Sequence, residues 1–177
     1  MHLYLSSSSP LRSTFSNAED QVLFKVETPV CLGTLTSSIS YVVPNDSDPN
    51  GSLSMQDKFA HLGQVEHKTK DYFRKEGWGP YGCGSHMIFL LRHRVFTASD
   101  GREYKWLLQA LTSKLIINDG TKTLVAYFHR RGLRVIGKPK RASLQIFASG
   151  AHIVHEILIT FIYVEKIRND RERALAS

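Results

Sequence analysis

The chain has 177 residues, of which 42% are hydrophobic and 22% are charged, so it fits a single globular domain with its own core and excludes wholesale disorder. Its two cysteines, Cys31 and Cys83, exclude a disulfide framework and a Cys-x-x-Cys zinc site. The most apolar segment, residues 157–164, is far shorter than the ~20 residues that a spanning helix needs. The N-terminus lacks the basic start and the apolar stretch of a signal peptide. We therefore expect a cytoplasmic protein without a transmembrane span. Any contact with a membrane would be peripheral.

The positive charge of the chain is concentrated in one segment. The net charge is +7, and residues 120–155 contain seven basic residues and no acidic residue. These are Lys122, Arg130, Arg131, Arg134, Lys138, Lys140 and Arg141. Elsewhere basic and acidic residues balance, so this segment carries the whole surplus. A local positive field of this kind attracts phosphate on a lipid, a nucleic acid or a small ligand.

The organisation predicted from turn signals is one domain with two irregular loops. The serine run before Pro10 predicts a flexible N-terminus over residues 1–10, followed by a single domain over 11–177. Residues near 44–57 are rich in Asn, Asp, Pro and Gly, and residues near 74–86 are rich in Gly. Both segments are predicted to be loops.

Short alternating segments predict a mostly β protein with antiparallel strands. Residues 21–27 place Val22, Phe24 and Val26 on one face, and residues 39–43 repeat the pattern. Residues 95–108 and 115–129 each read as a hairpin with Asp-Gly in its turn, and 144–147 adds a short strand. The chain therefore predicts roughly eight to twelve strands in a barrel or a sandwich.

The C-terminal segment is the ambiguous one. Residues 153–167 are apolar nearly all round, so a helix here would have to be buried. The β-branched residues suit a strand equally well, and periodicity does not decide between the two. The length of the segment and its charged exit over 165–173 favour a helix near 151–172.

Several segments together resemble a family of unknown function from mushroom-forming fungi. The segments are 13–29, 95–106, 125–130, 142–146 and 160–165, of which Val95–Trp106 is the most specific. That family is similar in turn to the tubby C-terminal and phospholipid-scramblase-like group. The resemblance implies a closed antiparallel barrel of about twelve strands around one apolar C-terminal helix. Gln21 follows Asp20 where the pattern has Gly, which puts the type of the first hairpin turn in question.

The resemblance also suggests a ligand, because tubby-like proteins bind phosphoinositide head groups in a basic groove. The leading hypothesis is a non-enzymatic module that binds anionic membrane lipid or phosphate. Its expected ligand residues are Arg130, Arg131, Arg134, Lys138, Lys140 and Arg141. No individual ligand residue is carried over from tubby-like proteins. A solvated basic face that serves solubility is the plain alternative.

No catalytic residue, metal ligand or cofactor site is predicted. His152, His155 and Glu156 have no further ligand pair at useful spacing, and their order is not the His-Glu-x-x-His motif. Cys83 and His86 share a Gly-rich loop, but no nucleophile signature surrounds them. The sequence thus favours a module without enzymatic activity.

Two further function classes stay open. In a protein–protein interaction scaffold, loops 44–57 and 74–86 would carry recognition. In a small-ligand-binding protein or an enzyme, Cys83 or His86 would join another titratable group in a pocket at one end of the barrel. Aromatic and basic residues alternate over residues 68–81, where packing onto the domain is the simpler explanation. Nucleic acid is disfavoured as a partner because no recognition-helix motif accompanies the charge.

Overall fold

Ten strands and one long helix make up the described part of the computed structural model, which covers residues 1–29, 35–43, 58–67, 94–109, 112–131 and 141–176. The strands are β1 (His2–Leu5), β2 (Ser13–Ser16), β3 (Val22–Glu27), β4 (Leu35–Val43), β5 (Lys58–His67), β6 (Val95–Thr97), β7 (Glu103–Leu108), β8 (Thr112–Ile117), β9 (Leu124–His129) and β10 (Ser143–Ile146). The helices are the short 3₁₀ turns η1 (Pro10–Arg12) and η2 (Ala148–Ile153) and the α-helix α1 (Val154–Ala176).

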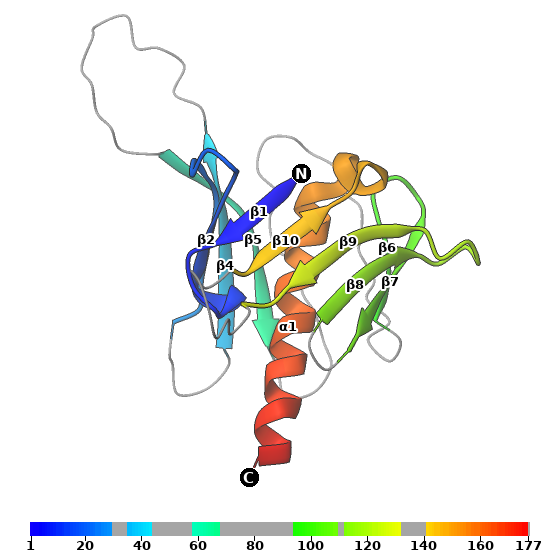
Figure 1. Cartoon of the computed structure of the whole chain (residues 1–177). Coiled ribbons are helices and arrows are strands. Elements are labelled where there is room, and N and C mark those ends of the chain that lie inside the picture. Colours follow the sequence, from blue (N-terminus) through cyan, green and yellow to red (C-terminus); the bar gives the residue numbers. More distant parts are fainter. Residues whose placement is uncertain (30–34, 44–57, 68–93, 110–111, 132–140, 177) are drawn as a thin grey trace, which may run out of the picture.

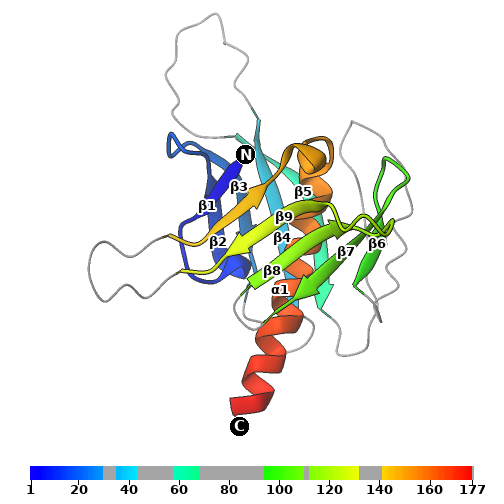
Figure 2. The ribbon, with the colours of Figure 1, turned by 45° about the vertical axis from the view of Figure 1, so that its right-hand side comes forward.

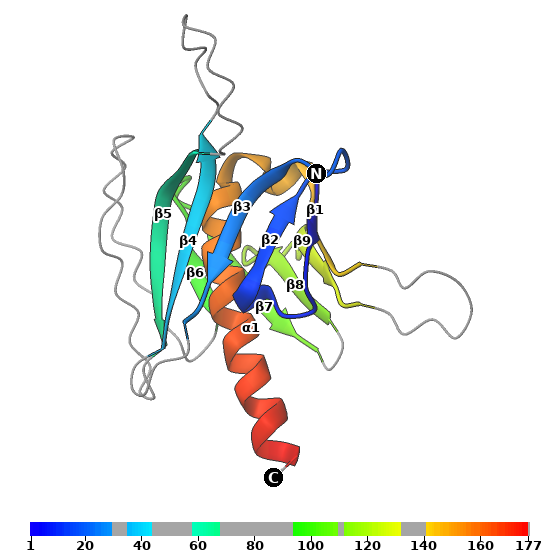
Figure 3. The same ribbon diagram turned by 90° about the vertical axis from the view of Figure 1, so that its left-hand side faces the viewer.

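All ten strands belong to one antiparallel sheet that curves around α1 (Figure 1). The strand order is β5-β4-β3-β2-β1-β10-β9-β8-β7-β6. Strands β2 to β5 run along one side of α1 (Figure 3), and β6 to β9 run along the other side (Figure 2). Strands β5 and β6 form the two edges and do not pair with each other. The expected closed barrel of about twelve strands is therefore wrong for the described strands, whereas the mostly β architecture is confirmed.

The N-terminus is part of the sheet. Strand β1 pairs with β10 on one side and with β2 on the other, so it lies in the middle of the strand order. The side chains of Leu3 and Leu5 are buried, with 0% and 2% of their surface exposed. The expectation of a flexible segment over residues 1–10 is thus wrong for residues 2–5. The His-Leu-Tyr-Leu alternation is a strand pattern, and the serine run that follows it obscured this signal.

The predicted hairpins are confirmed with their turns. Strands β6 and β7 pair around Gly101, whose φ is +77°, and β8 and β9 pair around Gly120, whose φ is +90°. Glycine adopts this left-handed conformation without steric cost. In β9, Val125 alternates with Ala126 and so lies on the opposite face from Ala126 and Phe128, yet all three are buried. The turn η2 covers Val125, since a Cβ atom on Gly150 would lie 2.6 Å from Val125 Cγ1.

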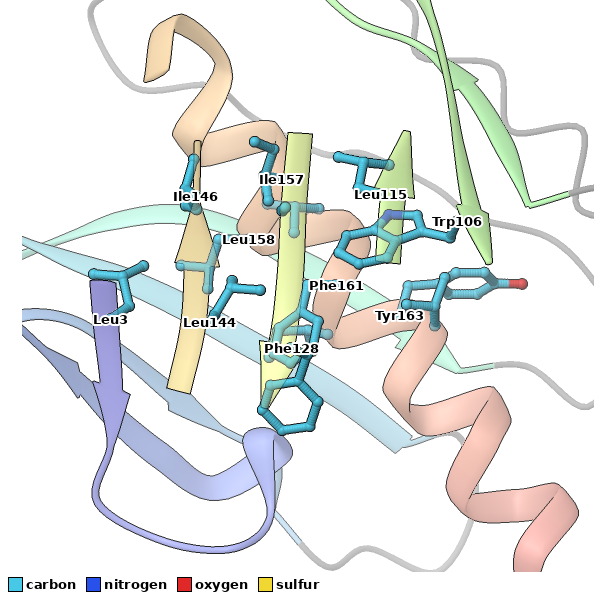
Figure 4. Packing of buried hydrophobic residues seen from close by; sticks show 14 of the residues in the cluster. Leu3, Trp106, Leu115, Phe128, Leu144, Ile146, Ile157, Leu158, Phe161 and Tyr163 are labelled. Atoms are coloured by element: carbon cyan, nitrogen blue, oxygen red, sulfur yellow. The ribbon is translucent and has the colours of Figure 1, made fainter. Parts of the chain in front are cut away.

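The predicted C-terminal helix is confirmed, and it forms the centre of the core. Its first half is buried on nearly every side, from Ile157 to Glu165. Phe161 packs against Phe128 of β9 and Trp106 of β7, with ring centroids 4.8 and 5.9 Å apart (Figure 4). This first half is apolar all round, and the curved sheet that surrounds it provides the burial that such a helix needs. No helix in the described ranges is both long and apolar enough to cross a membrane.

Candidate functional site

The outer face of strands β1, β10, β9 and β8 carries basic and aromatic side chains. None of these four adjacent strands contains an aspartate or a glutamate. We call this surface the basic–aromatic face. It comprises His2, Tyr4, Lys114, Tyr127, His129, Arg141 and Gln145. Their alternate partners along the strands, such as Leu3 and Phe128, point inward and are buried against α1.

Strand register places these side chains in two rows across the sheet. In the first row His2 pairs with Gln145, Gln145 with Tyr127, and Tyr127 with Lys114. In the second row Tyr4 pairs with Ser143, Ser143 with His129, and His129 with Thr112. Directly opposite residues on one face of an antiparallel pair have Cβ atoms roughly 5 Å apart. The two rows therefore form one continuous patch.

Contacts within the patch join cations to rings. The Lys114 ammonium lies 5.3 Å from the centre of the Tyr127 ring, and the Arg141 guanidinium lies 5.2 Å from the centre of the Tyr4 ring. The rings of Tyr127 and His129 are 4.4 Å apart, and His129 Nε2 lies 3.1 Å from Gln145 Oε1. These contacts hold the positive groups close to the sheet.

The structure separates the predicted basic ligands. Arg141 extends over the outer face and donates a hydrogen bond of 2.8 Å to Asp20 in the β2–β3 turn. Arg130 instead reaches α1 and donates a hydrogen bond of 2.9 Å to Glu172. Arg131 is exposed and directly follows Arg130 at the end of β9. The other three predicted ligands, Arg134, Lys138 and Lys140, lie outside the described residues.

Arg130 is the outermost residue of a series of charged side chains that extends along α1 into the core. Its hydrogen bond to Glu172 lowers the pKa of that carboxyl. Arg168 donates to Glu165, and Ser113 Oγ donates to the same carboxylate over 2.7 Å. Glu165 is fully buried, and this burial raises its pKa. This series ties α1 to β8 and β9, so Arg130 serves the fold on the helix side of the sheet.

Sequence analysis missed a serine–histidine pair. Ser37 Oγ lies 2.8 Å from His67 Nε2, and its other neighbour is Thr28 Oγ1 at 2.6 Å. A nucleophile next to a base has this geometry. Ser37 is fully buried, however, and burial lowers the pKa of His67 to about 4. Since a substrate does not reach a buried hydroxyl, the pair links β4 to β5 and is not a catalytic centre. The two residues are 30 apart in sequence, so no motif signals them.

The two histidines considered for a metal site have other contacts. His152 Nε2 lies 2.9 Å from Asp100 Oδ2, which also accepts a hydrogen bond of 2.6 Å from Tyr104. The ring of His155 packs against Phe24 and Tyr41, with centroids 5.8 and 5.9 Å apart. Within the described ranges no three His, Cys, Asp or Glu side chains lie together as a metal site would require.

Glu156, the third residue of that group, joins α1 to the β6–β7 turn. Its Oε1 atom accepts a hydrogen bond of 3.0 Å from the backbone N–H of Ser99. Together with the contact between His152 and Asp100, this bond docks the Ser99–Gly101 turn on the beginning of α1. Of the residues of the metal hypothesis, His152 and Glu156 therefore hold a hairpin in place, whereas His155 packs on β3 and β4.

A family comparison covers most of the chain. Residues 8–170 match the model of a family of unknown function, DUF6593. The chain belongs to this family. No curated protein and no solved structure matches it.

The DUF6593 match confirms the expected membership of a family of unknown function, and it shows no link to the tubby and scramblase-like group. The segment over 13–29 and the Val95–Trp106 hairpin both lie within the matched residues. Cys83, His86 and the aromatic residues over 68–81 lie outside the described residues. The hypotheses built on them stay predictions.

A second surface feature lies on the outer face of β2 and β3. It is a hollow of about 780 Å³ beside Arg12, Lys25 and several hydroxyl groups. Lys25 is paired there with Glu27 at 2.9 Å, and Arg12 Nε donates to the backbone oxygen of Thr28 over 2.9 Å. Glu27 puts a carboxylate in the lining of the hollow, whereas the four strands of the basic–aromatic face contain none, so the hollow offers a weaker anion site than that face.

Proposed function

We propose that this DUF6593 protein is a non-enzymatic module that binds anionic membrane lipid through the basic–aromatic face and the 130–141 stretch at its border. One observation carries the proposal. Four adjacent strands have no carboxylate, and their outer face carries two tyrosine rings, one with Lys114 and the other with Arg141 lying over it. A surface of this composition attracts phosphate head groups, because the strands carry no negative charge that would repel them.

The combination of basic residues with tyrosines on this face is suited to a membrane surface. A Lys or Arg near an anionic membrane surface contributes about 1 kcal/mol of binding. Tyrosine side chains favour the head-group level of a membrane, because the ring can contact apolar groups there while the hydroxyl stays hydrated. Lys114 with Tyr127, and Arg141 with Tyr4, provide both properties at two points of the face.

The position of the basic stretch adds to this argument. Ser143 at the start of β10 pairs with His129 at the end of β9. Arg130 and Arg131 directly follow β9, and Arg141 precedes β10 by two residues, so both ends of the stretch attach at the same end of the face. Of the seven basic residues that make up the surplus charge, six belong to this stretch, whose two described ends lie at one border of the face.

Co-sedimentation with vesicles tests the proposal. We expect the protein to pellet with phosphatidylcholine vesicles that contain phosphatidylserine or a phosphoinositide, and we expect added salt to weaken this binding. The triple variant K114E/R131E/R141E reverses three charges on or beside the face. At about 1 kcal/mol per charge, it should weaken binding on the order of 100-fold.

The matched control is R102E/R171E/R173E, which makes the same change of charge at three exposed arginines away from the face. It should retain binding. If both variants lose vesicle binding equally, net charge alone explains the loss. If both variants retain vesicle binding, the proposal is contradicted. Thermal unfolding of each variant confirms that the fold is intact.

One observation favours protein binding as a second candidate. Val43 and Phe59 are exposed by 36% and 40% at the end of the β4–β5 hairpin, next to the 44–57 segment. Exposed apolar side chains at the base of a loop suit a protein contact. A pull-down that V43S/F59S abolishes, combined with no vesicle binding by the wild type, would favour this scaffold function over lipid binding.

A further inference from the structure

An aspartate occupies a left-handed backbone position beside the basic–aromatic face. Asp20, in the turn between β2 and β3, has a φ of +61°. Asn17 holds this turn, because its Oδ1 atom accepts hydrogen bonds from the backbone N–H groups of Glu19 and Gln21 at 3.1 and 2.9 Å. Asp20 is thus the left-handed residue of this turn, and Gln21 follows it and donates one of the two hydrogen bonds to Asn17. Gln21, which stands where the family pattern has Gly, does not have a left-handed φ, so this turn does not require glycine there.

Glycine adopts this conformation without steric cost, and asparagine or aspartate do so at a moderate cost. The side chain of Asp20 has a specific contact in return. Its Oδ1 atom accepts a hydrogen bond of 2.8 Å from Arg141 Nη1. The Arg141 guanidinium also lies over the Tyr4 ring of β1. A carboxylate therefore already occupies one of the donors with which Arg141 would bind an anionic ligand.

We infer that Asp20 is an internal ligand of Arg141 that competes with bound anions and makes the face selective for phosphomonoesters over phosphodiesters. The inference rests on the proposed function, whose site it refines. Arginine binds carboxylate and phosphate with the same fork of N–H donors. A monoanionic phosphodiester offers Arg141 no more charge than Asp20 does. A phosphomonoester carries a charge of about −1.5 to −2 at neutral pH and displaces the carboxylate more readily.

The exposure of the pair makes such an exchange feasible. The side chains of Arg141 and Asp20 are 54% and 68% exposed, so solvent screens their attraction. Exposed ion pairs contribute about 0.2 to 1 kcal/mol. Removal of the competing carboxylate should therefore strengthen the binding of a monoanion by up to about fivefold.

The test uses two kinds of vesicle adjusted to equal surface charge. Both contain phosphatidylcholine, one with phosphatidic acid, whose head group is a phosphomonoester, and one with phosphatidylserine. Wild-type protein should prefer the phosphatidic acid vesicles. In the variant Asp20→Asn, which retains a residue suited to the left-handed conformation, binding to phosphatidylserine should rise and the preference should shrink.

Two matched variants control for the added positive charge. Glu27→Gln removes the carboxylate that pairs with Lys25 on β3, and Glu172→Gln removes the partner of Arg130 on α1. Each changes net charge by the same amount as Asp20→Asn, and each should leave the preference between the two lipids unchanged. Soluble glycerol 3-phosphate serves as the competitor that separates the phosphate group from the membrane. Release of bound protein by it indicates that the head group is recognised, and no release indicates that the membrane surface is required.

The outcomes separate the two proposals. If wild-type protein binds and Asp20→Asn leaves the preference unchanged, or changes it no more than Glu27→Gln does, the role of Asp20 is refuted and lipid binding stands. If wild-type protein binds neither kind of vesicle, the proposed function fails and this inference fails with it. A smaller preference in Asp20→Asn alone supports both.

Discussion

The indole N–H of Trp106 in β7 donates a hydrogen bond of 3.0 Å to Thr160 Oγ1 in α1. Both residues are buried, with 1% and 0% of their surface exposed. The Thr160 hydroxyl in turn donates to the backbone oxygen of Ile157 over 3.1 Å. A single hydroxyl thus satisfies the only polar atom of the largest buried side chain in the described core and fixes how α1 sits against the sheet.

Thr160→Val should destabilise the protein by about 1 to 3 kcal/mol, because it leaves the Trp106 N–H buried without an acceptor. Urea unfolding measures the loss. Thr160→Ser keeps the hydroxyl and is the control. In a Trp106→Phe background the donor is absent, so the cost of Thr160→Val should become smaller. An undiminished cost there would show that side-chain shape and not the hydrogen bond is responsible.

A charge inside α1 should unfold the domain. Ile159 and Phe161 are 5% and 0% exposed, and Phe161 contacts rings from two different strands. Ile159→Asp or Phe161→Asp buries a carboxylate without a partner, which is severely destabilising. Arg171→Asp on the exposed last part of the helix should fold normally. Circular dichroism and thermal unfolding distinguish these outcomes, and a cooperatively folding Phe161→Asp protein would show that α1 is not the centre of the core.

Much of this fold follows from local patterns. Strand β3 alternates over Val22–Glu27, and the Asp-Gly turns of two hairpins set the register of their strands. The all-round apolarity of residues 157–164 required burial, and the curved sheet provides it. Whether the sheet closes into a barrel could not be predicted in this way, because closure depends on pairing between the two edge strands, β5 and β6. No local pattern encodes that contact.

The candidate site was only partly predictable for the same reason. The charge excess over residues 130–141 is visible in the sequence, but strand geometry sends Arg130 to the helix and Arg141 to the outer face. The aromatic half of the face comes from β1 and β9, and pairing through β10 puts His2 in one row with Tyr127 and Tyr4 in one row with His129. Their spacing in sequence gives no sign of this proximity.

Gly150→Ala should be destabilising by about 1 to 3 kcal/mol through overpacking. A Cβ atom at this position in η2 would lie 2.6 Å from Val125 Cγ1 and 2.8 Å from Ile157 Cδ1. Gly63→Ala in β5 is the matched control, since its Cβ atom would meet Ile159 Cδ1 at an ordinary 3.7 Å. Urea unfolding should separate the two variants, and equal stability would mean that η2 moves aside at little cost.

The stability of the protein should fall between pH 6.5 and pH 4 partly because of His67. Burial, followed by the nearby charge of Lys166, lowers the pKa of His67 from 6.5 to about 4 in the folded state. In this pH range the unfolded chain binds a proton at His67 and the folded protein does not, so acid favours unfolding. The contribution of His67 is complete above pH 6.5 and disappears as the pH falls to about 4. A shift of this size corresponds to a loss of about 3 kcal/mol.

His67→Gln isolates this contribution, because an amide keeps a hydrogen-bonding group near Ser37 and does not titrate. Its free energy of unfolding should depend less on pH between 6.5 and 4 than that of the wild type. His61→Gln removes an exposed imidazole from the same strand without any contact to Ser37 and should retain the wild-type dependence. Urea unfolding at half-unit pH steps provides the comparison. Parallel curves for His67→Gln and the wild type would mean that His67 binds its proton over the same pH range in the folded and the unfolded state, and that burial beside Ser37 does not exclude the charge.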